Sequence, residues 1–162
     1  MLGSFLTLLG VLVSSSLPIA EEVQKVSKIS LADLVIEQLQ QSATSKDVER
    51  RLGKPTGREA VPEVPQAPGG YSWNYRDLQF TFDQHGKRLM AVLTGSSRVT
   101  ARRLRVGQST KRALQLYGRP FDQNDDYMVW EVAEDPDETL GMMILLSKGF
   151  VTKIQLGEVI EY

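Results

Sequence analysis

A short motif that ends a helix occurs twice in this chain at one constant offset. Residues 48–55 (VERRLGKP) recur as residues 113–120 (ALQLYGRP), so that Gly53 corresponds to Gly118. A glycine just after the last turn of a helix readily takes a positive φ, and a proline two residues later prevents the helix from continuing. The sequence therefore predicts two helices of the same design, one in each half of the chain.

The segments that follow the two motifs also correspond to each other. Polar and apolar residues alternate there with the period of half-buried antiparallel strands. The expected strands are 71–75, 78–82 and 89–93 in the first half and 127–132, 140–146 and 150–156 in the second. A helix laid across one face of such a sheet gives a two-layer α+β domain. We therefore expect two tandem repeats, each a helix plus a three-stranded antiparallel sheet, that pack together or share a sheet.

The predicted domain boundaries follow from this repeat. Residues 30–95 form the first α+β repeat and residues 102–162 the second. An extra helix is expected over 31–41, because Ser30 and Asp33 resemble a capping box and four apolar residues share one helical face. Residues 56–70 contain three prolines and three glycines, which is typical of an irregular loop.

The composition limits the function classes that remain open. The 162 residues carry a formal net charge of -1, which removes the usual argument for nucleic-acid binding. The chain has no cysteine, which excludes disulfides, thiolate catalysis and cysteine metal sites. Hydrophobic residues make up 41% of the chain, enough for a packed core. Stability must therefore come from packing alone.

The N-terminal segment 1–20 has the character of a signal peptide or an N-terminal anchor. No charged residue occurs from Leu2 to Ala20, and small residues follow an apolar run at 5–13. No lysine or arginine precedes that run, so a retained anchor or a buried helix is an alternative to a cleaved signal peptide. We expect an extracytoplasmic protein (periplasmic, cell-envelope or secreted) whose membrane contact is limited to this segment, if it is uncleaved.

Motifs that would carry chemistry are incomplete. His85 is the only histidine, and a catalytic triad or a zinc site needs further partners. The phosphate-loop and calcium-loop patterns near Lys54 and over 122–126 each lack residues that the motif requires. We therefore assign no catalytic, cofactor-binding or metal-binding residue and expect a protein that is not an enzyme.

Charged and aromatic residues suggest a partner-binding surface instead. Basic residues cluster before and inside the second helix, and acidic residues cluster after it. The cluster either orients a protein partner or complements acidic loops within the same domain. Exposed aromatic side chains would add anchors, although packing within the core is equally compatible with their pattern. The candidate partner-binding residues are Arg102, Arg103, Arg105, Tyr71, Trp73, Tyr75 and Tyr127.

The order of these elements resembles the SmpA/OmlA-like (BamE-like) fold family. The resemblance rests on a capped helix ending in Leu-Gly-x-Pro, an aromatic strand, an apolar strand, a glycine-containing turn and a closing strand, over residues 42–157. The tandem arrangement is similar to that of β-lactamase inhibitory proteins. The resemblance implies a secreted or envelope protein that works by protein–protein contact and has no catalytic residue.

The leading hypothesis is a non-catalytic protein-binding module, such as an envelope assembly or scaffold factor, with another protein as its partner. A secreted enzyme inhibitor and a small-ligand-binding protein with a pocket between helix and sheet are the alternatives. A scaffold would use the exposed sheet, whereas an inhibitor would present a long loop such as 56–70 or 134–138.

Overall fold

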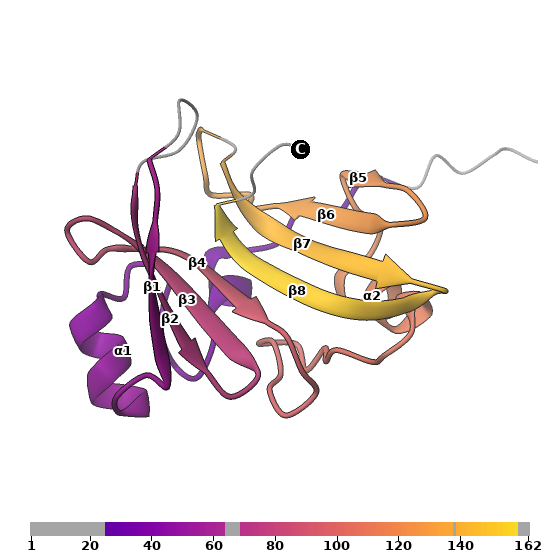
Figure 1. Ribbon diagram of the computed structural model, residues 1–162. Helices are drawn as coiled ribbons and strands as arrows, with labels where there is room; N and C mark the ends of the chain where they lie inside the picture. The colour runs from indigo at the N-terminus through magenta and orange to yellow at the C-terminus, as the bar shows by residue number, and fades with distance from the viewer. Residues whose placement is uncertain (1–24, 64–68, 138, 159–162) are drawn as a thin grey trace, which may run out of the picture.

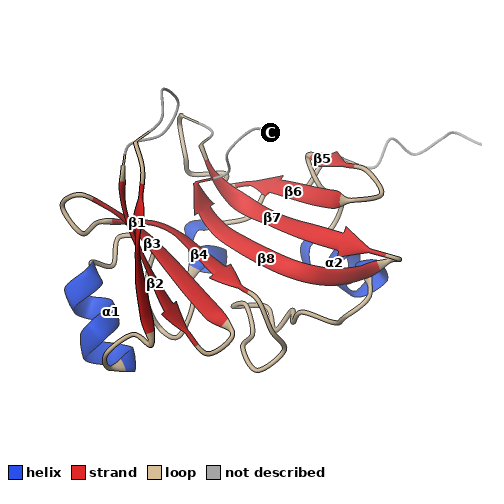
Figure 2. Ribbon diagram, in the orientation of Figure 1, coloured by secondary structure: helices blue, strands red, loops and turns tan. Residues whose placement is uncertain are grey.

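The computed structural model describes residues 25–63, 69–137 and 139–158, and they form one eight-stranded antiparallel sheet with helices on one side (Figures 1 and 2). The strand order is β1-β2-β3-β4-β8-β7-β6-β5. The strands are β1 (Gly57–Val61), β2 (Gly70–Tyr75), β3 (Leu78–Asp83), β4 (Arg88–Leu93), β5 (Asp122–Gln123), β6 (Tyr127–Glu131), β7 (Leu140–Ser147) and β8 (Phe150–Glu158).

This architecture contradicts the predicted pair of helix-plus-three-strand repeats. Among the described residues, each half of the chain supplies one α-helix and four strands, and the eight strands belong to a single sheet. The junction is the antiparallel pairing of β4 with β8, in which Ala91 lies opposite Leu156 and Leu93 opposite Ile154. The two halves therefore share a sheet.

The two α-helices begin and end as the repeated motif predicts. Helix α1 (Ser45–Leu52) is capped by the Thr44 hydroxyl, which accepts a hydrogen bond from the Asp47 backbone N–H, and α2 (Thr110–Tyr117) is capped in the same way by Ser109. The glycines that follow have φ of 80° at Gly53 and 75° at Gly118, which confirms the expected positive φ. Their ψ values of -167° and -162° lie in a region essentially restricted to glycine, not in the left-handed helical region we expected.

A continuous row of apolar side chains forms the core. Directly opposed residues of antiparallel strands lie on the same face, so the strand register connects Trp73, Phe80, Ala91, Leu156, Met142 and Trp130 across six strands. Helix α1 contacts this face through the Tyr71 hydroxyl, which donates to Ser45 Oγ at 3.0 Å. Helix α2 contacts it through Tyr117, whose ring lies 5.7 Å from that of Trp130. Both helices therefore cover one face, which we call the helix face.

The prediction of a helix over 31–41 is wrong, because only a 3-10 turn (η1, Leu31–Leu34) forms there. Ile36 and Leu39 instead exchange backbone hydrogen bonds around a two-residue turn in which Glu37 and Gln38 both have positive φ. The fully buried guanidinium of Arg88 donates to the carbonyls of Leu34 and Leu39 and to the Gln41 side chain. These hydrogen bonds use carbonyls that a helix would have consumed, and they hold the segment against β4.

The loop predicted over 56–70 is also partly wrong, because β1 occupies residues 57–61 and pairs with β2. The short strand β5 was likewise not expected. The predicted N-terminal signal or anchor segment 1–20 lies outside the described residues. Within the described residues, no helix is long and apolar enough to cross a membrane.

Candidate functional site

The face of the sheet opposite the helices is not covered by a described helix (Figure 2). We call it the open face. One row of opposed residues crosses all eight strands on this side. It consists of Gly57, Asn74, Gln79, Val92, Gln155, Met143, Val129 and Asp122.

Apolar side chains on the open face lie on both sides of the middle strand β8, whose own side chains on this face, Gln155 and Lys153, are polar. Val92 is 5% exposed and Met143 6%, so both lie deep in the surface. Half-buried apolar side chains surround them, namely Met90, Tyr127, Val129 and Leu145. A mixture of apolar and polar side chains is compatible with a protein–protein interface, which as a whole is about as apolar as the rest of a protein surface. Methionine side chains adapt to irregular surfaces, which favours contact with a partner protein.

A hydrogen-bonded series of polar side chains defines the margin over the first three strands. Gln79 Nε2 donates to Asn74 Oδ1 at 2.9 Å, and Asn74 Nδ2 donates to Glu59 Oε1 at 2.9 Å. The series fixes the orientation of both amides, because each side-chain nitrogen has an acceptor. Glu59 is thereby left as an exposed acceptor at the end of the series.

Three of the predicted aromatic anchors do not face outward on this surface. The residues Tyr71, Trp73 and Tyr75 lie on the helix face. Trp73 is 7% exposed and packs edge-on against Phe82, and the Tyr75 hydroxyl donates to the Gly53 carbonyl at 3.0 Å. Burial is the main reason that the pKa of Tyr75 lies above its usual value. The alternative that these side chains pack in the core is the one the structure supports.

Tyr127 does lie on the open face, because it is opposed by Leu145. Its hydroxyl donates to Asp122 Oδ2 at 2.7 Å, and this hydrogen bond raises the pKa of Tyr127. The half-buried ring therefore stands next to Leu145, with its hydroxyl directed to Asp122. It is the one predicted aromatic residue that the structure places in this surface.

The three arginines of the predicted cluster have different surroundings. Arg102 forms a two-point ion pair with Asp33 and also donates to the Leu116 carbonyl. Its partner is thus in the N-terminal segment, not in the acidic loops of the second half as one interpretation had it. Arg103 and Arg105 are exposed, and the backbone of Arg105 donates to the Gln108 side chain and accepts from the Gln108 N–H. The three arginines therefore do not act as one unit.

Sequence reasoning missed the apolar residues of the open face, chiefly Val129, Met143 and Leu145. The indication was present in β7, whose sequence LGMMILLS is apolar at nearly every position. A strand of an antiparallel sheet with one solvated face normally alternates apolar and polar residues. An unbroken apolar strand in a sheet with helices on one side implies apolar side chains on the other side as well.

The open face presents mainly apolar and amide side chains, which can contact another molecule. Among the residues that the structure describes, no group of three or more His, Cys, Asp or Glu side chains is placed to hold a metal ion. An antiparallel sheet can leave one of its faces uncovered by helices, and such a face is accessible to another molecule. Comparisons with protein-family models, with curated proteins and with solved structures find no match for this chain.

Proposed function

We propose that this chain is a non-catalytic, extracytoplasmic protein-binding module that uses the open face of its sheet to bind a partner protein. The observation that carries the proposal is the group of apolar side chains on β6 and β7 of that face, where Val129 and Leu145 are half-buried beside Met143 with no described helix above them. Contiguous apolar side chains within a polar rim mark interaction sites on soluble proteins.

The extracytoplasmic location rests on the charge-free segment from Leu2 to Ala20 and the two glutamates that follow it. The resemblance to the SmpA/OmlA-like family supports an envelope assembly or scaffold role. A scaffold of this kind needs a rigid surface rather than a reactive site, and the single eight-stranded sheet supplies one.

Site-specific photo-crosslinking in the native host tests the proposal. A photoreactive amino acid is introduced at Leu145 on the open face and, as a matched control, at the exposed Lys111 on α2. We expect one discrete adduct from position 145 and none from position 111. The additional change Val129→Lys should reduce the adduct from position 145, because a charge is then placed inside the apolar contact. Adducts of equal yield from both positions, or no adduct from the open face, would refute the proposal.

A further inference from the structure

The two edges of the sheet differ in their capacity to pair with another strand. At one edge β5 contains two residues, whereas at the other β1 contains five, from Gly57 to Val61. In the described part of the chain β1 pairs only with β2. Arg58, Glu59 and Ala60, the middle residues of β1, are exposed. An edge strand presents unpaired backbone groups to any extended segment that approaches it.

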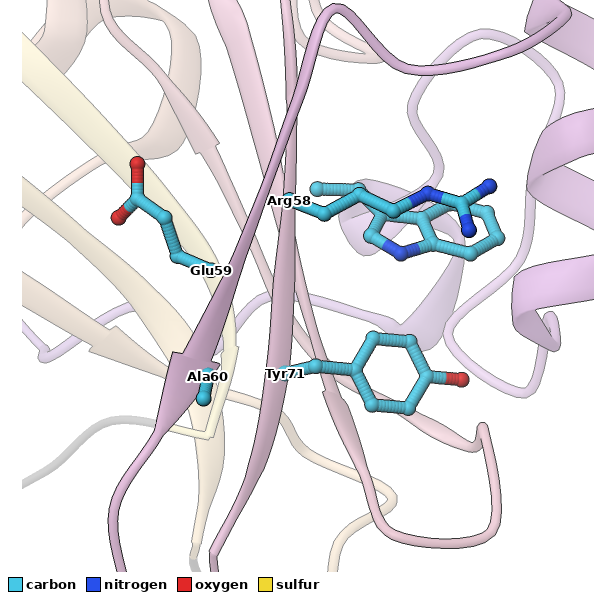
Figure 3. A pocket seen from close by; sticks show the side chains of 5 residues that line it. Arg58, Glu59, Ala60 and Tyr71 are labelled. Atoms are coloured by element: carbon cyan, nitrogen blue, oxygen red, sulfur yellow. The ribbon is translucent and has the colours of Figure 1, made fainter.

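A hollow of about 450 Å³ adjoins this edge (Figure 3). It is lined by Arg58, Glu59, Ala60, Tyr71 and Trp73. Ala60 lies opposite Tyr71 on the neighbouring strand. Because the Ala60 side chain is a single methyl group, it does not cover the Tyr71 ring, which lines the hollow. A side chain of an added strand that lies beside Ala60 would therefore meet an aromatic wall.

The two charged side chains of β1, Arg58 and Glu59, extend on opposite sides of the sheet. The Arg58 side chain extends on the same side of the strands as Tyr71, while Glu59 extends on the other side (Figure 3). The Arg58 guanidinium lies 4.8 Å from the centre of the Trp73 ring. Arg58 Nη2 lies 3.7 Å from Glu49 Oε1, with the two side chains exposed at 58% and 40%. Such an exposed pair is weak, so a carboxylate on an added strand can compete for the guanidinium.

We propose that β1 binds an extended peptide segment of a partner protein by strand addition. In the antiparallel orientation the peptide carries, from N- to C-terminus, an apolar or aromatic residue opposite Ala60, a basic residue opposite Glu59 and an acidic residue opposite Arg58. Backbone hydrogen bonds supply affinity in this mode of recognition, and alternate side chains supply specificity. This site adjoins the open face through Glu59, but it binds its peptide along the free edge of β1 and not across the face.

The charge order of the peptide gives a test with a matched control. The probes are the five-residue peptides Thr-Phe-Lys-Glu-Thr and Thr-Phe-Glu-Lys-Thr, which have the same composition and exchanged charges. Binding to the full chain is followed by titration of backbone amide chemical shifts. We expect the first peptide to bind about tenfold more tightly, since two cross-strand pairs change from attractive to repulsive in the second. The shifts should concentrate on residues 57–61 and on Tyr71 and Trp73.

Two further measurements separate strand addition from simple charge attraction. The double variant Arg58→Glu with Glu59→Arg should reverse the peptide preference while its melting temperature confirms an intact fold. The first peptide N-methylated at alternate residues should lose binding, because methylation removes strand hydrogen bonds. Equal affinity for the two peptides, no binding of either, or retained binding after N-methylation would overturn the proposal. Self-association of the chain that the double variant abolishes would also overturn it, in favour of a second copy at this edge.

Discussion

The guanidinium of Arg102 and the carboxylate of Asp33, which are 69 positions apart in the sequence, form a two-point ion pair. Arg102 Nε lies 2.6 Å from Asp33 Oδ1, and Nη2 lies 2.7 Å from Oδ2. The Asp33 side chain is 6% exposed, and Arg102 also stacks 5.0 Å from the Tyr117 ring centre. The pair thereby ties the N-terminal segment to the chain that leads into α2.

Loss of this pair should destabilise the fold. In an Arg102→Gln variant the Asp33 carboxylate loses its charged partner while it stays buried. Because Arg102 itself is 41% exposed, we expect a cost of about 1–2 kcal/mol, less than for a fully buried pair. That corresponds to a fall in melting temperature of roughly 3–6 °C. Thermal denaturation followed by circular dichroism measures it, with Arg105→Gln as an exposed control that should change little.

The same pair should make stability depend on acid pH. Burial alone would raise the pKa of Asp33, but hydrogen bonds from Arg102 and the Ser30 backbone outweigh burial and hold the pKa below its usual value. A carboxylate whose pKa is lowered by folding contributes its full stabilisation at any pH above its unfolded-state pKa of about 3.9. That stabilisation is lost as the pH falls through the folded-state pKa. The stability advantage over Asp33→Asn should therefore be constant at neutral pH and shrink below about pH 4.

Denaturant titrations of both proteins between neutral and acid pH test this expectation. The difference between the two proteins is the relevant quantity, because the pKa values of Asp47, Asp77 and Asp135 are also lowered and destabilise both proteins in acid. A difference that stays unchanged through the acid range would show that the ion pair does not contribute in this way.

The parts of the fold that could be predicted from sequence are those specified by neighbouring residues. The Thr44 and Ser109 caps and the two terminating glycines lie within a few residues of the helices they delimit. The pairing of β4 with β8 joins Ala91 to Leu156 without any turn between them. No local pattern encodes such a contact. A sheet shared by the two halves was therefore predicted only as an alternative to two repeats that pack together.

The segment 31–41 shows how tertiary contacts override a local helical pattern. Its apolar spacing predicts a helix, yet the Asp33 carboxylate bonds to Arg102 and the carbonyls of Leu34 and Leu39 bond to Arg88. Strand β1 was missed for the opposite reason. Its sequence GREAV is exposed at the three central positions and has no apolar alternation, so only pairing with β2 defines it.

The two terminating glycines allow a matched comparison. An added Cβ at Gly53 meets nothing within 4 Å, so Gly53→Ala should report backbone strain alone, about 1–3 kcal/mol. At Gly118 the added Cβ would also overlap the Ser27 side chain. Gly118→Ala should therefore cost more than Gly53→Ala, and Ser27→Gly in the same chain should remove the excess. Equal losses of unfolding free energy in the two single variants, measured by urea titration, would contradict this account.

Arg88 provides the last test, because it is a buried cation whose hydrogen-bond acceptors within the described residues are neutral, namely two backbone carbonyls and the Gln41 amide. Burial lowers the pKa of Arg88 to about 10, so the guanidinium is charged at neutral pH and depends on neutral acceptors. An Arg88→Met variant keeps much of the volume but leaves the carbonyls of Leu34 and Leu39 without these donors. We expect a loss of roughly 2–4 kcal/mol, as for other buried acceptors that lose their partners.

Arg88→Lys should not restore the loss, because one ammonium group cannot reproduce the forked geometry that reaches both carbonyls and Gln41. Hydrogen exchange localises the effect. Exchange of the Leu39 amide, which donates to Ile36 across the turn, should accelerate more than exchange of Phe80 in the centre of the sheet. An equal change at both amides would mean that Arg88 stabilises the whole sheet and does not hold the N-terminal segment in particular. Arg98→Gln is the control, since Arg98 contacts the same turn through Glu37 from a partly exposed position and its loss should be small.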